Sequence, residues 1–240
     1  MLGREVVAHG GRVIIRPSKT NGAVRLRLAG REAPVSLRPS FPSGPETDPV
    51  EALLTSTAVV ALAEIGDKTQ LLAIVLAARF KRPWPIILGI LVATLANHFL
   101  AALAGDMAAS LLDGRAFRYA VAVSFIAMAA WTLVPDKLDD DEAPRPSRFG
   151  PFLTTTVAFF LVEMGDKTQI ATIALGARFH DALWVTAGTT LGMMLANAPA
   201  VLLGDALVKR VPLPVVRAVA ALLFLVIGVW LLLQTAGFTP

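Results

Sequence analysis

The sequence of 240 residues has no cysteine, a single tyrosine and three histidines. The absence of thiols excludes disulfides, thiolate metal sites and cysteine nucleophiles. Charged residues are also scarce, at 17% of the chain, whereas hydrophobic residues make up 55% and the mean hydropathy is +0.64. This balance is too apolar for a soluble domain of this length and indicates an integral membrane protein.

Basic charge is concentrated in the first 49 residues, which carry eight Lys/Arg against four Asp/Glu. Residues 50–240 carry fourteen of each, so the whole net charge of +4 belongs to the N-terminal segment. A pI near 9.8 alone would suggest a nucleic-acid binder. Since the rest of the chain has no charge excess, we expect no nucleic-acid partner.

Residues 1–49 differ in composition from everything that follows. They contain no long apolar run and no signal-peptide core with a small-residue cleavage site. Proline, glycine and arginine dominate, so we expect a disordered segment or a mis-annotated extension of a protein that starts at Val50. A genuine tail on the cytoplasmic surface is the alternative, and it would require the opposite membrane topology.

Six apolar stretches are each near the roughly 20 residues that cross a bilayer. They are residues 51–79, 85–105, 116–134, 151–178, 183–204 and 213–235. We therefore expect an all-α, multi-pass protein of the lipid bilayer. The longest link, 135–150, contains the acidic run Asp139–Glu142, which we expect to be a solvated loop, with a regulatory or ion-gathering role as the alternative.

The chain contains an internal repeat with an offset of 99 residues. The segment Glu64–Gln70 returns as Glu163–Gln169, and eleven of seventeen positions are identical between 64–80 and 163–179. The first repeat covers 51–134 and the second covers 151–235. Because each repeat has three spans, an odd number, the second must enter the membrane from the opposite side. The predicted fold is six transmembrane helices arranged as two inverted three-helix repeats.

The repeated motif is predicted to lie near the membrane midplane. Glu64 follows Glu51 by 13 residues, or about 20 Å along a helix. A straight helix over the 28 residues of 151–178 would be about 42 Å long against a core of about 30 Å. A tilt or a break is therefore required, and Gly66 and Gly165 are the natural places for a break.

The Lys/Arg residues in the links between spans predict how the protein is oriented in the membrane. The links after the first, third and fifth spans hold nine Lys/Arg, and the links after the second and fourth hold three. The positive-inside rule places the first set, together with the acidic loop, in the cytoplasm and both chain ends outside.

The motif supplies carboxylates at a depth where charge is costly. On a continuous helix Glu64 and Asp67 lie on one face, and inverted symmetry brings Glu163 and Asp166 opposite them. Four carboxylates with Lys68 and Lys167 give a formal charge of −2, which matches one divalent cation. Oxygen ligands favour Ca²⁺, Mn²⁺ or Mg²⁺ over zinc or copper, and without a cation the clustered carboxylates should take up protons.

Other polar residues are candidates for the surroundings or the path of the ion. They are Lys68, Thr69, Gln70, Asn97, Lys167, Thr168, Gln169 and Asn197. The two asparagines either line the path or form hydrogen bonds between helices. His98 has alanine as its counterpart, Ala198, which argues against a symmetric ligand role.

A purely structural interpretation is that Glu64 and Lys68 form an i, i+4 ion pair that simply neutralises the helix. Each charge at the bilayer centre costs roughly 2.5–3.5 kcal/mol. Three charges per motif, present in both copies, favour a functional site over this alternative.

With its twin Glu-x-Gly-Asp-Lys-Thr motifs, the chain resembles the calcium/manganese:proton antiporter family, which includes bacterial manganese exporters and Golgi divalent-cation transporters. The resemblance covers residues 51–235 and implies that Glu64, Asp67, Glu163 and Asp166 ligate the transported cation. It also implies an exchange of Mn²⁺ or Ca²⁺ for protons, with no enzyme activity and no resident cofactor. The resemblance to bacterial manganese exporters implies a location in the bacterial inner membrane. The sequence does not specify an oligomeric state.

Two other functions stay open from the sequence. One is export of a small organic solute such as an amino acid, which rests on superfamily analogy. The other is a non-transporting membrane assembly factor.

Overall fold

The computed structural model describes residues 4–8, 11–17, 24–28, 31–35, 48–112, 114–135, 149–204 and 212–238. The chain divides into two compact units, Met1–Glu46 and Thr47–Pro240. Each unit has its own kind of secondary structure.

The N-terminal unit is a four-stranded antiparallel sheet in the order β1-β2-β3-β4. Its strands are β1 Arg4–Ala8, β2 Gly11–Pro17, β3 Val24–Leu28 and β4 Arg31–Val35. The expectation of disorder over residues 1–49 is therefore wrong for these strands, and the all-α expectation holds only for the second unit. Average composition conceals local alternation such as Val-Arg-Leu-Arg-Leu in β3, whose period of two favours a strand.

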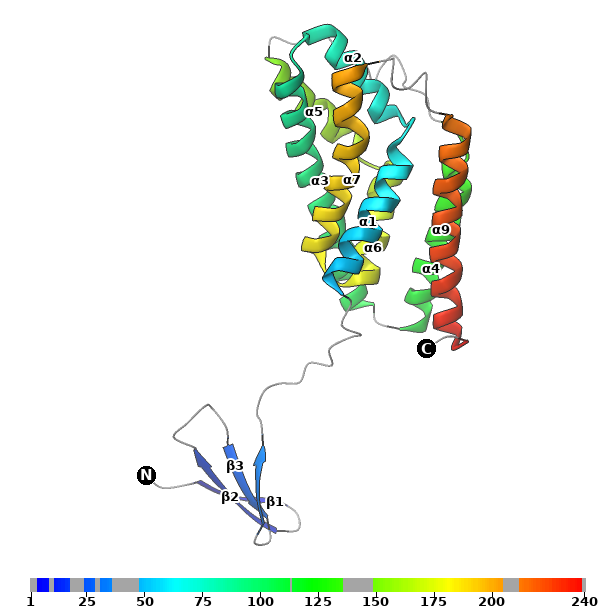
Figure 1. The fold of residues 1–240 in the computed structure, drawn as a ribbon. Helices are drawn as coiled ribbons and strands as arrows, with labels where there is room; N and C mark the ends of the chain where they lie inside the picture. Colours follow the sequence, from blue (N-terminus) through cyan, green and yellow to red (C-terminus); the bar gives the residue numbers. More distant parts are fainter. Residues whose placement is uncertain are drawn as a thin grey trace. The chain divides into compact units, whose positions relative to one another are not determined.

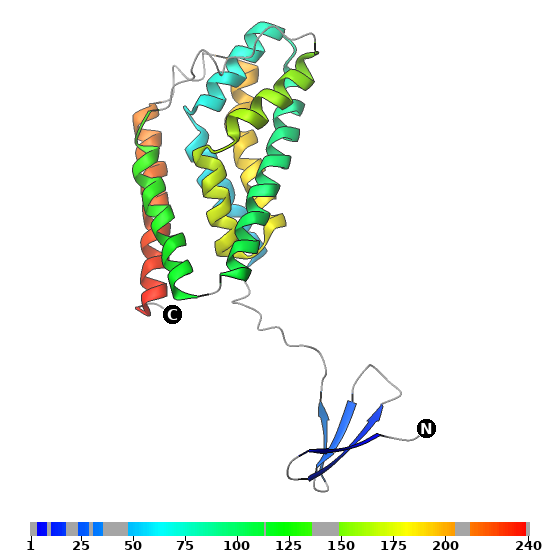
Figure 2. The same cartoon turned by 180° about the vertical axis from the view of Figure 1, so that it is seen from behind.

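Over its described residues, the second unit is helical (Figures 1 and 2). The first repeat forms α1 Pro49–Glu64, α2 Lys68–Phe80, α3 Pro83–Leu111 and α4 Arg115–Thr132. The second repeat forms α5 Pro151–Glu163, α6 Lys167–Phe179, α7 Ala182–Leu203 and α9 Leu213–Ala236. The helices of the two repeats therefore correspond one to one.

The first predicted span of each repeat is broken at the motif. In the first repeat the chain leaves the helix between α1 and α2, and in the second it does so between α5 and α6. Gly66 and Gly165 both have φ +81°, a backbone conformation that costs little only for glycine. The predicted break at these two glycines is confirmed.

Three helices of the described residues are long and apolar enough to cross a membrane by length and composition: α3, α7 and α9. Many large apolar side chains on them are exposed, among them Leu100 on α3, Leu195 on α7 and Leu222 on α9. An exposed apolar surface of this extent suits lipid better than water. These helices indicate a multi-pass membrane protein.

The two repeats pack against each other in a reciprocal way. Helix α1 runs along α7, and its counterpart α5 runs along α3, while α4 and α9 lie side by side (Figures 1 and 2). A Cβ at Gly188 would lie 2.5 Å from the Leu53 carbonyl oxygen, and one at Gly89 would lie 2.8 Å from that of Phe152. Both contacts relate positions 99 apart, so small residues allow a close approach of helices in both repeats.

Part of the predicted topology falls outside the described residues. Residues 136–148 contain the acidic run Asp139–Glu142, and residues 205–211 contain Lys209 and Arg210, which entered the charge count. The cytoplasmic location of the acidic loop stays a prediction.

Candidate functional site

Each motif lies where one half-helix ends and the next begins. Glu64 is the last residue of α1, and Asp67 is the N-cap residue of α2; Glu163 and Asp166 have the same places at α5 and α6. The prediction that Glu64 and Asp67 share a face of one continuous helix is wrong, because α1 ends at Glu64 and α2 begins only at Lys68, after the break at Gly66. The same break removes the helical geometry proposed for a Glu64–Lys68 ion pair.

The motif glutamines form hydrogen bonds across the two helix breaks. The Gly66 N–H donates to Gln70 Oε1 at 2.8 Å, and the Gly165 N–H donates to Gln169 Oε1 at 2.6 Å. These bonds satisfy backbone groups that the interrupted helices leave without a partner in the same helix. Gln70 and Gln169 therefore hold the breaks in shape.

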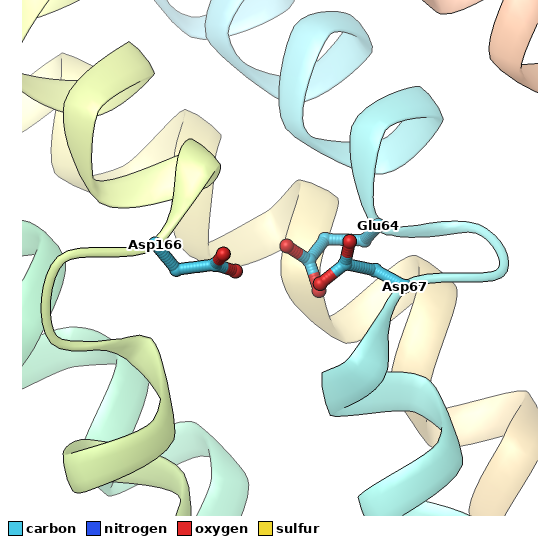
Figure 3. A group of neighbouring side chains, drawn as sticks. All are labelled: Glu64, Asp67 and Asp166. Carbon is cyan, nitrogen blue, oxygen red and sulfur yellow. The ribbon is translucent and has the colours of Figure 1, made fainter. Parts of the chain in front are cut away.

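Three of the four predicted carboxylates converge. One oxygen each from Glu64, Asp67 and Asp166 lies within 4.8 Å of the others, and Figure 3 shows the three side chains directed toward one another. All three residues are buried. Two come from the first break and one from the second, so the cluster depends on both repeats.

Glu163 is buried beside this cluster but lies outside the group of three. Glu64 and Asp166 are both within electrostatic range of its carboxylate. Its Oε2 lies 3.4 Å from His98 Nε2. In the sequence, His98 was matched with Ala198. The 99-residue offset that relates Gly89 to Gly188 along the same two helices instead pairs it with Asn197, which is also buried.

Both motif lysines reach the aspartate of the opposite repeat. Lys167 Nζ lies 2.7 Å from Asp67 Oδ1, and Lys68 Nζ lies 3.8 Å from Asp166 Oδ1. Lys167 is buried, whereas the Lys68 side chain is 19% exposed. Each pair joins a residue of the first repeat to a residue of the second. The lysines therefore connect the two repeats and also offset the negative charge of the aspartates.

The motif threonines contact the glutamates of their own repeats. Thr69 Oγ1 donates a short hydrogen bond to Glu64 Oε2, and Thr168 Oγ1 donates to Glu163 Oε2 at 3.5 Å. Both threonines are buried. They orient one oxygen of each glutamate.

The two asparagines have different partners. Asn97 Oδ1 accepts a short hydrogen bond from Gln169 Nε2, which joins α3 to α6. Asn197 Nδ2 donates to the Met193 carbonyl oxygen at 3.2 Å, within its own helix. Gln70 Nε2, the counterpart of Gln169, donates to the Ala196 carbonyl oxygen at 3.0 Å. Asn97 thus forms an interhelical hydrogen bond, one of the two roles that the sequence left open.

This arrangement can hold a hard cation. Carboxylate and hydroxyl oxygens are the ligands that Ca²⁺, Mg²⁺ and Mn²⁺ prefer. Within the described residues, Glu64 Oε1 and Glu163 Oε1 are buried and have no hydrogen-bond partner. A buried carboxylate oxygen without a partner is costly, and a bound cation or a proton would satisfy it.

Comparison with known proteins identifies relatives of the helical unit. The chain matches the family described as divalent cation/proton antiporter GDT1 over residues 52–140 and 151–237. The match spans both repeats.

Individual relatives agree with this match. A Vibrio cholerae protein named "Putative manganese exporter" is 51% identical over 190 residues, which cover 79% of this chain and 92% of that protein. A GDT1-like protein of Synechocystis is 29% identical, over 71% of this chain and 91% of its own length. GDT1-like protein 3 of Arabidopsis thaliana is 29% identical, over 73% and 68%. No solved structure matches the chain.

Proposed function

Because the chain belongs to the GDT1 divalent cation/proton antiporter family, we propose that it exports a divalent cation in exchange for protons. Mn²⁺ is the first candidate and Ca²⁺ the second. The name of the Vibrio cholerae relative supports manganese. The transported ion is the substrate, and the protein has no resident cofactor in this proposal.

The observation that carries the proposal is the buried convergence of Glu64, Asp67 and Asp166 at two broken helices. Carboxylates inside an apolar helical body cost free energy, and a single fold-stabilising ion pair would not require three. Ends of broken helices are where transporters of this architecture bind ions. We infer that Glu64, Asp67, Glu163 and Asp166 provide the ligands.

The proposed membrane architecture is six spans in two inverted repeats. Reciprocal contacts support an internal two-fold axis: Lys68 meets Asp166 as Lys167 meets Asp67, and both pairs relate by the same 99-residue offset. A two-fold relation produces such exchanged pairs. With three spans per repeat the axis lies in the membrane plane, and rocking one repeat against the other exposes the site to either side.

The lysines explain how the empty carrier can reorient. With no cation bound, Lys167 and Lys68 offset the aspartates of the opposite repeats, which reduces the charge that must cross the membrane. A divalent cation competes with the ammonium groups for the aspartates and displaces them. Protons taken up by the carboxylates then accompany the return step.

The experiment is transport by the purified full chain in proteoliposomes. Mn²⁺ uptake and the internal pH are followed together, the pH with an entrapped dye. We expect Mn²⁺ entry to require an inwardly acid pH gradient, to raise the internal pH and to collapse with a protonophore. Entry that continues unchanged without any proton movement would show a uniporter or channel and overturn the exchanger.

The two other functions considered from the sequence are less well supported. An amino-acid carrier needs a positive group for the substrate carboxylate, whereas Lys68 and Lys167 are engaged with aspartates. Neither the family description nor the names of the relatives supports an assembly factor.

A further inference from the structure

His98 is a buried side chain with two ring nitrogens, and it lies close to the second motif. It lies on α3 with no exposed surface, and neither ring nitrogen has a hydrogen-bond partner among the described residues. Buried polar groups are nearly always hydrogen-bonded, and each exception requires an explanation. Packing alone would be served better by leucine.

Its ionisable neighbour is Glu163, the motif glutamate that lies outside the group of three carboxylates. His98 Nε2 lies 3.4 Å from Glu163 Oε2, but the two atoms are not aligned as a hydrogen bond. Two ligands at right angles around one ion, at metal–ligand distances of about 2.0–2.6 Å, lie about 2.8–3.7 Å apart. The observed separation fits two neighbouring ligands of one ion.

The other oxygen of Glu163 supports the same interpretation. Glu163 Oε1 is buried and has no hydrogen-bond partner in the described part of the chain. The carboxylate is within electrostatic range of Glu64 and Asp166. Glu163 therefore interacts electrostatically with two members of the carboxylate cluster, and both it and His98 are buried, although neither belongs to the group of three.

We propose that His98 is a nitrogen ligand of the transported cation, acting together with Glu163, and that it favours Mn²⁺ over Ca²⁺. This inference rests on the proposed function and adds a determinant of its substrate choice. Ca²⁺ takes oxygen ligands, whereas imidazole binds first-row transition ions. A mixed set of oxygens and one nitrogen retains Mn²⁺ and penalises Ca²⁺.

The asymmetry of the repeats is part of this inference. The 99-residue offset that relates Gly89 to Gly188 places Asn197 at the equivalent position of the second repeat, so only one side of the site has an imidazole. A single imidazole in a set of four carboxylates changes the selectivity but keeps the ligands predominantly oxygen.

The direct test is electron spin echo spectroscopy of Mn²⁺ bound to the purified full chain. We expect modulation from a directly bound nitrogen that changes when the protein is produced with ¹⁵N-histidine. This isotope comparison needs no substitution, so it holds even if variants fold poorly. Bound Mn²⁺ without any histidine nitrogen signal would overturn the inference and leave the proposed function standing, whereas absence of Mn²⁺ binding would overturn both.

Variants then assign the signal. His98→Ala should abolish the nitrogen modulation and weaken Mn²⁺ binding at least about tenfold, with a much smaller change for Ca²⁺. Two controls should keep the signal: His180→Ala, whose histidine is exposed near Asp106, and Thr94→Ala, a buried residue one turn from His98 on α3. Equal losses of Mn²⁺ and Ca²⁺ binding in His98→Ala would make His98 a packing residue and overturn the inference.

Discussion

The two repeats have the same broken-helix backbone but different side-chain surroundings at the break. Gly66 and Gly165 have the same φ, and each break is closed by its own glutamine. In contrast, Glu64 joins the cluster with Asp67 and Asp166, whereas its counterpart Glu163 faces His98. A duplicated sequence therefore guarantees a duplicated backbone but not two equivalent sets of ligands.

The two motif lysines also differ in their surroundings. Lys167 is buried and close to Asp67, whereas Lys68 is partly exposed and 3.8 Å from Asp166. The shorter and more buried ion pair is therefore the one between Lys167 and Asp67, the aspartate in the same motif as Glu64. Four changes can break or sharpen this comparison between the repeats.

The largest effect is expected from the clustered carboxylates. Glu64→Gln, Asp67→Asn and Asp166→Asn should each reduce Mn²⁺ efflux by more than about 100-fold, since ligand loss exceeds the 10–100-fold cost of losing a supporting residue. Glu163→Gln should also abolish efflux if all four carboxylates act as ligands. The measurement is efflux from loaded cells, with insertion checked in membrane fractions. Glu51→Gln, an exposed carboxylate, is the control, and wild-type efflux in all four variants would contradict the shared site.

A smaller and unequal effect is expected from the lysines. Lys167→Met removes an ammonium group 2.7 Å from Asp67 and should lower transport on the order of tenfold, since supporting residues of metal sites cost 10–100-fold. Lys68→Met should lower it less, because its pair is longer and more exposed. Transport rates in proteoliposomes measure the difference. Equal losses would mean that the two lysines act equivalently in the cycle.

The glycines of the breaks should also differ. Alanine at either position adds left-handed strain of about 1–2 kcal/mol. At Gly66 the new Cβ would also meet the Leu213 side chain at 2.6 Å, whereas no atom of the described residues lies within 4 Å of one at Gly165. Gly66→Ala should therefore lower the thermal unfolding temperature in detergent more than Gly165→Ala. The reverse order would show that the contact with α9 is easily relieved.

The smallest effect is expected from an ion pair that only one repeat has. Arg178 Nη2 lies 3.3 Å from Glu51 Oε1, and the position equivalent to Glu51 is Gly150. The Glu51 side chain is 53% exposed, so Glu51→Gln should cost less than about 1 kcal/mol of stability. A thermal unfolding curve in detergent measures this, and a large loss would show that the pair stabilises the contact between α1 and α6.

Local sequence determined much of the helical unit. The duplication, the apolar stretches and the excess length of the first span predicted corresponding helices and a break at Gly66 and Gly165, because these properties depend on neighbours along the chain. The strands of the first unit were missed because composition averaged over 49 residues conceals alternation in runs of five to seven.

The tertiary structure decided what surrounds each motif residue. Symmetry predicted four equivalent carboxylates, yet packing placed three together and left Glu163 against His98. Sequence spacing suggested that Glu64 and Lys68 pair along one helix, but Lys68 and Lys167 reach across to the other repeat. These contacts join residues about 65 to 100 positions apart, and their partners depend on how α2, α3, α5 and α6 pack. Spacing along the chain therefore specifies the two breaks, while the packing of the repeats determines which carboxylates lie close together.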